Sequence, residues 1–576
     1  MILRLLLAGV FVCIASAQAQ PNIIVVMPDD MGYGDLGATG NAVIRTPNLD
    51  RFATESAELT DFYVSPVCSP TRACLMTGRY NYRTRCIDTF KGRSMMDPEE
   101  FTMAEMLKEA GYTTGIFGKW HLGDNYPLRP QDQGFDEVLI HRGGGLAQPS
   151  EPIENDSRYT DPVLFENGKQ VQKTGYCTDI YFDEAIEFME KSKEAGKPFF
   201  VYLPPNAPHG PYHDVPEDLL AYYQSVDLSP VLNGKKDRKH VDTVARVFAM
   251  VENIDQNMGK LDAYLRESDQ FENTMVLFFT DNGPNTMRYV GPFRGMKSHV
   301  HEGGIRTMFY ARWPEKLEAG TGSDRIAAHI DVMPTLMEVA GYEKRTDLKL
   351  DGESFLPLLS GEGVRGGGRT LFIQSHRGNE PVEFHHFAAR EQDWKLVRGT
   401  GFGNEKVKSQ EPFELYQISK DPGETIDLAA ENPEKVAELK AAYAAWLEDV
   451  SSTRSRNYDP PRIIIGAAAE PSSDLSIQDW RVPSGATGWG TRGEWKVTVA
   501  EEGEYSAAVK WTNPIGDREV VLRIGDQRFS GQLSGSESEL TFPGFSLKRG
   551  ETEVSVEVSG EITKEDLLRF VTIERL

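Results

Sequence analysis

The chain has 576 residues, of which 39% are hydrophobic and 10% aromatic, a composition typical of a soluble globular protein. This length is too great for one hydrophobic core, so two or three domains are expected. The formal net charge of −25 argues against nucleic acid as a partner, and it requires any anion-binding site to be positive locally.

Residues 1–19 have the pattern of a secretory signal peptide. Arg4 precedes an apolar run, and the small residues after that run place a cleavage site near Ala17 or Ala19. The run is too short for a membrane-spanning helix, and no later stretch is long and apolar enough to form one. We therefore expect a periplasmic or secreted protein with no integral membrane segment in its mature form.

Four runs rich in β-branched and aromatic residues predict buried strands, and the segments between them have helical periodicity. Strands that alternate with helices predict an α/β fold in which helices sandwich a mostly parallel sheet. The strands are expected at Asn22–Met27, Thr113–Phe117, Pro198–Leu203 and Thr274–Phe279, and the main amphipathic helices at 103–110, 181–189 and 244–261.

Charged or polar side chains closely follow each of the four predicted strands. Ligand sites in open α/β sheets lie beyond the carboxyl ends of the strands, so these segments are expected to meet at one edge of the sheet. The side chains are Asp29 and Asp30 after the first strand, Lys119 and His121 after the second, His209 after the third, and Asp281 and Asn282 after the fourth.

The pattern changes near Arg369. Short strands at 370–374, 386–390 and 394–397, followed by a charged helix near 433–447, predict a small antiparallel subdomain. Residues 451–461 are polar and end in Pro460-Pro461, which indicates a linker. Six strand-like runs separated by Gly and Asp turns then predict an all-β sandwich. These runs are 462–465, 495–499, 505–511, 519–524, 552–558 and 570–574.

The most informative stretch is Cys68-Ser69-Pro70-Thr71-Arg72-Ala73-Cys74-Leu75-Met76-Thr77-Gly78-Arg79. Ser69 is a good N-cap and Pro70 a good first helical residue, so a helix is expected to begin here and to end at Gly78. Residue 68 then lies at a helix N-terminus, where free N–H groups and the helix dipole favour an anion. Arg72, one turn further on, can point back at the same charge. Taken alone, Cys68 would favour a buried structural cysteine before an ordinary capped helix.

This stretch resembles the type I sulfatase signature C-x-P-[ST]-R-x-x-L-x-T-G-R. In that family a maturation enzyme oxidises the cysteine to formylglycine, whose hydrate attacks the sulfur of a sulfate ester and then releases sulfate. The resemblance covers roughly residues 21–447 and implies an alkaline-phosphatase-like fold with a formylglycine-generating enzyme as a partner. It also implies that the nucleophile is made from Cys68.

Two more segments resemble the halves of the family's metal site: Pro28-Asp29-Asp30-Met31-Gly32-Tyr33-Gly34-Asp35 and Thr280-Asp281-Asn282-Gly283. The resemblance implies that Asp29, Asp30, Asp281 and Asn282 bind one divalent cation together with an oxygen of modified Cys68. An all-oxygen site rich in carboxylate suits a hard cation, and the resemblance implies calcium. Zinc is not expected, because neither segment contains a histidine or thiolate ligand.

Three further segments resemble sulfatase motifs that bind sulfate and move protons. The resemblance implies that Lys119 and Lys297 hold sulfate oxygens as point charges. It makes His209 the candidate to protonate the leaving alcohol and His121 the candidate to accept a proton as sulfate is released. The segments are Gly118-Lys119-Trp120-His121-Leu122-Gly123, Ala207-Pro208-His209-Gly210-Pro211, and Gly295-Met296-Lys297 with Glu302-Gly303-Gly304-Ile305-Arg306.

These observations predict a signal peptide at 1–19, a sulfatase catalytic domain at 20–368, its antiparallel subdomain at 369–450, a linker at 451–461 and an accessory β-sandwich at 462–576. The sandwich contains none of the matched motifs, so the core is expected to hydrolyse a small aryl sulfate without it, unless the two share a large apolar interface.

The expected function is hydrolysis of sulfate esters, with sulfated polysaccharides or oligosaccharides favoured by secretion and by the sandwich. Candidate residues for the sugar subsites are Arg142, His141, His385 and His386. One alternative is a phosphonate monoester hydrolase or phosphodiesterase of the same superfamily, which can carry the same modified cysteine. The other is a non-catalytic glycan-binding protein in which Cys68 stays a thiol.

Overall fold

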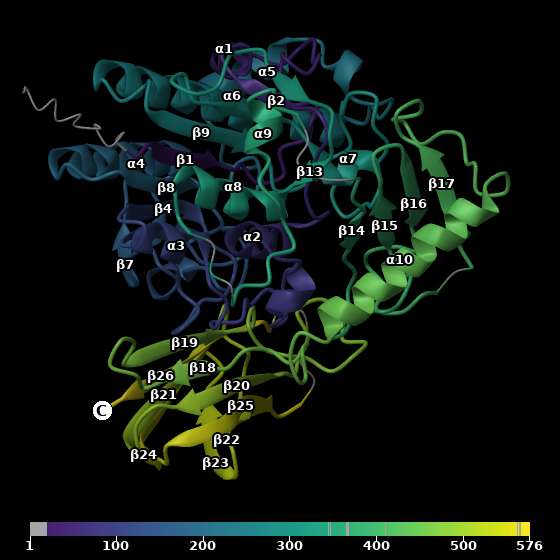
Figure 1. Ribbon diagram of the computed structural model, residues 1–576. Coiled ribbons are helices and arrows are strands. Elements are labelled where there is room, and N and C mark those ends of the chain that lie inside the picture. The colour runs from purple at the N-terminus through teal and green to yellow at the C-terminus, as the bar shows by residue number, and fades with distance from the viewer. Residues whose placement is uncertain are drawn as a thin grey trace, which may run out of the picture.

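The computed structural model describes residues 20–343, 345, 347–363, 368–408, 410–560, 563 and 566–576. The expected signal peptide at 1–19, with its cleavage site near Ala17 or Ala19, lies outside the described residues. Figure 1 shows a large α/β body, a small antiparallel subdomain at its side and a β-sandwich beneath it. Within the part of the chain that the structure describes, no helix combines the length and the apolar character needed to cross a membrane.

The α/β body is built on a ten-stranded sheet, which confirms the predicted fold class. β1 (Asn22–Val26) is central, with β9 (Thr274–Phe279) and β8 (Phe199–Leu203) parallel to it on either side and β4 (Thr113–Lys119) parallel to β8. Strands buried on both faces need continuous apolar runs, which is why these four were recognisable in the sequence. The sheet order is β12-β2-β11-β9-β1-β8-β4-β5-β6-β7, with β12 (Gly322–Ser323), β2 (Ala57–Leu59), β11 (Phe309–Arg312), β5 (Glu137–His141), β6 (Val163–Glu166) and β7 (Lys169–Gln172).

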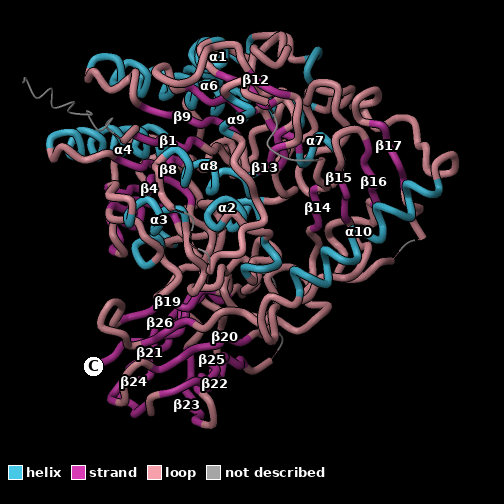
Figure 2. The backbone as a smooth tube through the Cα atoms, in the orientation of Figure 1, coloured by secondary structure: helices cyan, strands magenta, loops and turns pink. Residues whose placement is uncertain are grey.

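Helices cover both faces of this sheet (Figure 2). Alternate residues of β1 point to opposite faces, so Ile24 and Val26 join one apolar cluster while Ile23 and Val25 join the other. On the first face lie α1 (Pro47–Thr54), α4 (Cys177–Glu194), α5 (Glu217–Ser225) and α6 (Arg238–Glu267), and on the second α2 (Cys68–Thr77), α3 (Met103–Glu109), α8 (Val332–Val339) and α9 (Leu356–Leu359).

The antiparallel subdomain is a four-stranded sheet against which one long helix packs. Glu302, from the segment that resembles E-G-G-x-R, is fully buried and forms a 2.9 Å ion pair with Lys395 of this sheet. This pair ties the subdomain to the α/β body. The elements are β14 (Leu371–Gln374), β15 (Phe387–Arg390), β16 (Trp394–Arg398), β17 (Glu414–Gln417) and α10 (Pro433–Ser451), with α7 (Glu302–Ile305) and the short strands β3 (Phe62–Tyr63), β10 (Arg306–Thr307) and β13 (Ala327–Ala328) beside them.

The C-terminal sandwich packs a five-stranded sheet on a four-stranded one around Trp480, Trp495 and Trp511. Six of its strands were predicted. The other three, β19, β23 and β24, lie at sheet edges, where strands are partly exposed and lack a clear apolar run. The sheets are β18 (Ile463–Ile465), β20 (Glu494–Val499), β25 (Gly550–Val558), β22 (Arg518–Ile524) and β23 (Gln527–Leu533), and β19 (Ser472–Ser476), β26 (Leu568–Arg575), β21 (Gly503–Trp511) and β24 (Glu539–Leu547).

The sandwich is joined to the α/β body mainly by polar contacts. The Ile464 N–H donates to the Tyr126 carbonyl at 2.9 Å, and the Gly92 N–H donates to the Gln478 carbonyl at 2.8 Å. Leu128 of the body packs into the apolar cluster of the sandwich. The contacts hold the sandwich against the loop that follows β4 and against the segment around Gly92.

Candidate active site

The central sheet brings the predicted site residues together. β9, β1, β8 and β4 are consecutive parallel neighbours, so their carboxyl ends meet at one edge. The segments that follow these strands carry Asp281 and Asn282, Asp29 and Asp30, His209, and Lys119 and His121.

Cys68 lies at the N-terminus of α2, as expected, where it is the first helical residue, and its side chain faces this edge. The predicted cap was wrong: Val67 occupies the N-cap position, and Ser69 lies inside the helix with its buried hydroxyl unpaired. The Thr71 hydroxyl anchors the first turn instead, because it accepts from the Ser65 N–H at 3.0 Å and donates to the Asp281 carbonyl at 2.7 Å. Gly78 ends the helix with φ 64°, as predicted.

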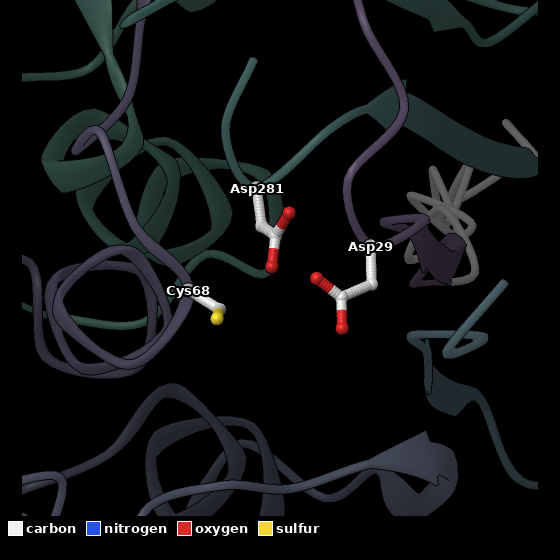
Figure 3. A group of neighbouring side chains, drawn as sticks. All are labelled: Asp29, Cys68 and Asp281. Atoms are coloured by element: carbon white, nitrogen blue, oxygen red, sulfur yellow. The ribbon is translucent and has the colours of Figure 1, made fainter. Parts of the chain in front are cut away.

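Figure 3 shows the thiol of Cys68 and the carboxylates of Asp29 and Asp281 converging on one space. Ligand atoms of these three residues lie within 4.8 Å of one another. Among the four proposed metal-binding side chains, three buried oxygens have no hydrogen-bond partner: Asp29 Oδ1, Asp30 Oδ2 and Asn282 Oδ1. Buried oxygens are costly to leave unpaired, and an all-oxygen set suits a hard divalent cation, so these residues fit the metal site implied by the sequence.

Three cationic side chains surround the carboxylates. Lys119 Nζ lies 2.5 Å from Asp29 Oδ2, and both side chains are fully buried. Lys297 Nζ pairs with Asp30 Oδ1 and lies 3.7 Å from Cys68 Sγ. Arg72 donates to Asp281 Oδ2 at 2.9 Å. These three cations balance the charges of Asp29, Asp30 and Asp281. A bound divalent cation would therefore make the site locally positive within an acidic protein, as a sulfate-binding site requires.

Burial raises the pKa values of the acidic groups in the site, whereas the neighbouring positive charges lower them. Burial would raise the pKa of Asp29, but the charges of Lys119 and the other nearby cations outweigh it and hold that pKa well below its usual range. Burial, together with the charge of Asp29, raises the pKa of Asp281 to about 7. Burial also raises the pKa of the Cys68 thiol, so the unmodified cysteine is a poor nucleophile here.

Two candidate residues have strained backbones. Asp30 has φ 65° and His121 has φ 61°, both in the left-handed region that non-glycine residues rarely adopt. Strain of this kind persists where the surrounding structure holds a side chain in one direction, and it is concentrated at functional sites.

His209 lies beside the carboxylate cluster. Its Nδ1 is 2.7 Å from the Gly210 carbonyl, which can only accept, so Nδ1 carries the proton of the neutral ring. Its Nε2 faces Asp30 Oδ2 at 3.7 Å. Burial lowers the pKa of His209.

His121 is held by residues that the sequence did not indicate. Its Nε2 lies 2.7 Å from the Thr89 carbonyl, so Nε2 carries the proton and Nδ1, which has no partner, is the basic nitrogen. Burial, followed by the charges of Lys119 and Arg72, lowers the pKa of His121 well below its usual value. Gln478 of the sandwich donates to the same carbonyl at 2.8 Å and approaches His121 Nε2 at 3.2 Å.

The four residues suggested for the sugar subsites are all buried: Arg142, His141, His385 and His386 are 8%, 0%, 0% and 4% exposed. Their placement argues against the suggestion, because most of their polar atoms bond inside the protein, although His141 Nε2 has no partner. His385 bonds to Thr400 Oγ1 at 2.5 Å, and Arg142 stacks over the Phe165 ring at 3.8 Å.

The chain is similar to known sulfatases. The family model described as Sulfatase matches residues 21–342, and one described as N-sulphoglucosamine sulphohydrolase, C-terminal, matches residues 295–452. N-acetylgalactosamine-6-sulfatase of Canis lupus familiaris is 31% identical over 473 residues, covering 74% of this chain and 85% of that protein. Arylsulfatase G of Mus musculus is 31% identical, covering 61% and 71%. The crystal structure of Ps i-CgsB in complex with k-i-k-neocarrahexaose has a TM-score of 0.64 at 28% identity, covering 75% of this chain and 93% of that chain.

Proposed function

Since the chain belongs to the sulfatase family and is a sulfuric ester hydrolase, we propose that it hydrolyses sulfate esters of sulfated polysaccharides or oligosaccharides. The reaction would use formylglycine made from Cys68 and one calcium ion. The observation that carries this proposal is the position of Cys68 at the N-terminus of α2, beside the Asp29 and Asp281 carboxylates and 3.7 Å from Lys297 Nζ.

The names of similar proteins support a glycan substrate. One relative is an N-acetylgalactosamine-6-sulfatase, and a similar solved structure contains k-i-k-neocarrahexaose. We propose that the mature protein is periplasmic or secreted, where such glycans occur, and that a formylglycine-generating enzyme matures it.

The proposed metal ligands are Asp29, Asp30, Asp281 and Asn282, with residue 68. Formylglycine would supply the nucleophilic oxygen as its hydrate, and calcium would supply fixed positive charge for the sulfate group. Asp29 and Asp30 accept from Lys119 and Lys297 in the structure. A divalent cation at these oxygens would compete with both ammonium groups and leave them available to sulfate oxygens.

The other side chains hold the site and move protons. Arg72 binds the Asp281 carboxylate and the Lys119 carbonyl, so it fixes one metal ligand relative to one sulfate-binding segment. His209, as its imidazolium, would protonate the leaving alcohol. His121 would accept a proton at Nδ1 during sulfate release, since its Nε2 is committed to Thr89.

The test is a comparison of proteins produced with a maturation system. Mass spectrometry of the peptide that contains residue 68 should show formylglycine, and the protein should hydrolyse a small aryl sulfate. Cys68→Ala should abolish turnover without changing the thermal unfolding temperature. Cys74→Ser, which alters a neighbouring buried thiol of α2, is the matched control and should remain active.

Two outcomes would overturn the proposal. Faster hydrolysis of a phosphonate monoester or a phosphodiester than of any sulfate ester would identify the alternative hydrolase. A fully modified protein that turns over no member of a panel of aryl and glycan sulfates would identify a binding protein.

A further inference from the structure

A basic groove lies where the three parts of the molecule meet. Its cavity volume is about 560 Å³, and its walls come from the loop at 90–93 of the α/β body, from residues 377 and 403–408 of the antiparallel subdomain, and from residues 484–488 of the sandwich. Five basic side chains line it against one acidic side chain, Glu405, although the whole chain carries a net charge of −25. The basic residues are Lys91, Arg93, Arg377, Lys406 and Lys408.

Several of these groups are held in place by the surrounding structure. Arg377 lies over the Phe90 ring at 4.3 Å, and Lys91 Nζ lies 4.9 Å from the same ring centre. Phe90 itself packs edge-on against Trp489 of the sandwich at 5.1 Å. The Lys91 ammonium also donates to the Ala486 carbonyl at 2.7 Å. Fixed cations lose less conformational entropy when an anion binds.

The acidic groups do not neutralise the groove, because its five cations face two carboxylates, Glu405 in its lining and the buried Asp88, which pairs with Arg93 and Arg377. Glu405 accepts from Arg93 at 3.3 Å and from the Gly485 N–H at 2.7 Å, so its charge is already engaged. Lys406 and Lys408 are exposed, and neither forms an ion pair with another described residue. An anionic ligand would therefore meet two uncommitted ammonium groups in addition to the held cations.

One wall of the groove is joined, through Thr89, to the residues that hold His121. Phe90 is adjacent in sequence to Thr89, whose carbonyl fixes His121. Arg377 donates to Thr89 Oγ1 at 3.0 Å and pairs with Asp88. Thr89 and Phe90 thus link the groove to His121, and the groove lies next to the candidate active site.

We propose that this groove is a substrate subsite for anionic groups, sulfate or carboxylate, on sugar residues next to the one that is desulfated. This inference rests on the proposed function and adds a substrate class: oligosaccharides with more than one negative group. It also assigns the sandwich a part in the substrate site, because Trp489 and Ala486 support Phe90 and Lys91.

The test measures binding in the Cys68→Ala background, so that no substrate is consumed. Calorimetry with a chondroitin sulfate hexasaccharide would compare Lys406→Ala/Lys408→Ala with the parent. The loss of two exposed ion pairs should weaken binding roughly 2- to 30-fold, and the difference should shrink at high salt. Lys193→Ala/Lys197→Ala is the control, because it removes two exposed lysines near the opposite edge of the sheet and should leave affinity unchanged.

Binding of unsulfated chondroitin hexasaccharide, which carries carboxylates but no sulfate, shows which of the two anionic groups the groove binds. If the groove binds carboxylates, the Lys406→Ala/Lys408→Ala variant also loses affinity for this ligand, and if it binds sulfates the loss is confined to the sulfated hexasaccharide. Equal affinities of parent and variant for the sulfated ligand, or no binding by the parent, would overturn the subsite. Turnover of a small aryl sulfate by the Cys68-containing variant should stay normal, so failure of the groove and failure of the proposed function give different results.

Discussion

The substitution Gln478→Ala should slow catalysis although residue 478 belongs to the sandwich. Its side chain is 1% exposed, and Nε2 donates to the Thr89 carbonyl at 2.8 Å and to Ser94 Oγ at 3.0 Å. The Thr89 carbonyl also accepts from His121 Nε2. Alanine would remove one of the two side-chain donors that hold this carbonyl and would loosen the group that fixes the tautomer of His121.

The magnitude follows from the buried hydrogen bond. The Thr89 carbonyl keeps His121 as a donor, so the variant loses one hydrogen bond, which is worth about 0.5–1.5 kcal/mol. If this loss falls on the alignment of His121, the proton transfer that accompanies sulfate release slows roughly 2- to 13-fold. Because only the later step is affected, kcat and KM for a small aryl sulfate should fall together while kcat/KM stays near its normal value.

The assay is steady-state kinetics together with thermal unfolding. Glu470→Ala is the matched control: Glu470 is also buried between the sandwich and the body, where it accepts from the Tyr126 N–H at 2.9 Å, but none of its hydrogen bonds involves His121. The Glu470→Ala variant should have a lower unfolding temperature and an unchanged kcat. An unchanged kcat in folded Gln478→Ala would refute the reasoning. Because Gln478 belongs to the sandwich, its contact with Thr89 and His121 also predicts that truncation at Tyr458 lowers aryl sulfatase activity. The sequence alone favoured a core that hydrolyses a small aryl sulfate without the sandwich.

Two further predictions concern the metal site and the proton donor. Asp30→Asn should weaken calcium binding at least about fivefold, because a buried charge next to the cation is lost. Calorimetry on chelator-treated protein measures this, with Asp183→Asn, on the surface of α4, as a control that should bind calcium normally. Equal affinities in the two variants would contradict the ligand assignment. His209→Ala should reduce hydrolysis of sugar sulfates by about 10²–10⁴-fold and of an activated aryl sulfate much less, since an aryl leaving group needs little protonation. Burial lowers the pKa of His209, so its protonated fraction, and with it kcat/KM on sugar sulfates, should fall as pH rises through a value below 6.5. Equal losses on both substrates, or a variant that keeps this pH dependence, would argue against the acid role.

The local signals in the sequence were sufficient for the central sheet and for the chemistry at its edge. The four central strands are buried on both faces and must be continuous apolar runs, so β1, β4, β8 and β9 could be recognised without a structure. The carboxylates, lysines and histidines follow these strands directly, and parallel neighbours place their carboxyl ends together. The edge strands β19, β23 and β24 lacked such a signal because exposed edges need no apolar run.

The tertiary structure alone decided which distant residues complete the site. Gln478 reaches His121 across 357 positions of sequence, and the groove joins residues 90–93 to residues 403–408 and 484–488. No local pattern encodes such contacts, because they depend on how the sandwich and the subdomain pack against the body. The sequence could not predict which polar side chains are buried, for the same reason. His385 and His386 look like surface ligands in the sequence, yet both are buried when the antiparallel sheet packs. The sequence thus determined the chemistry carried by each strand end, and packing determined what surrounds it.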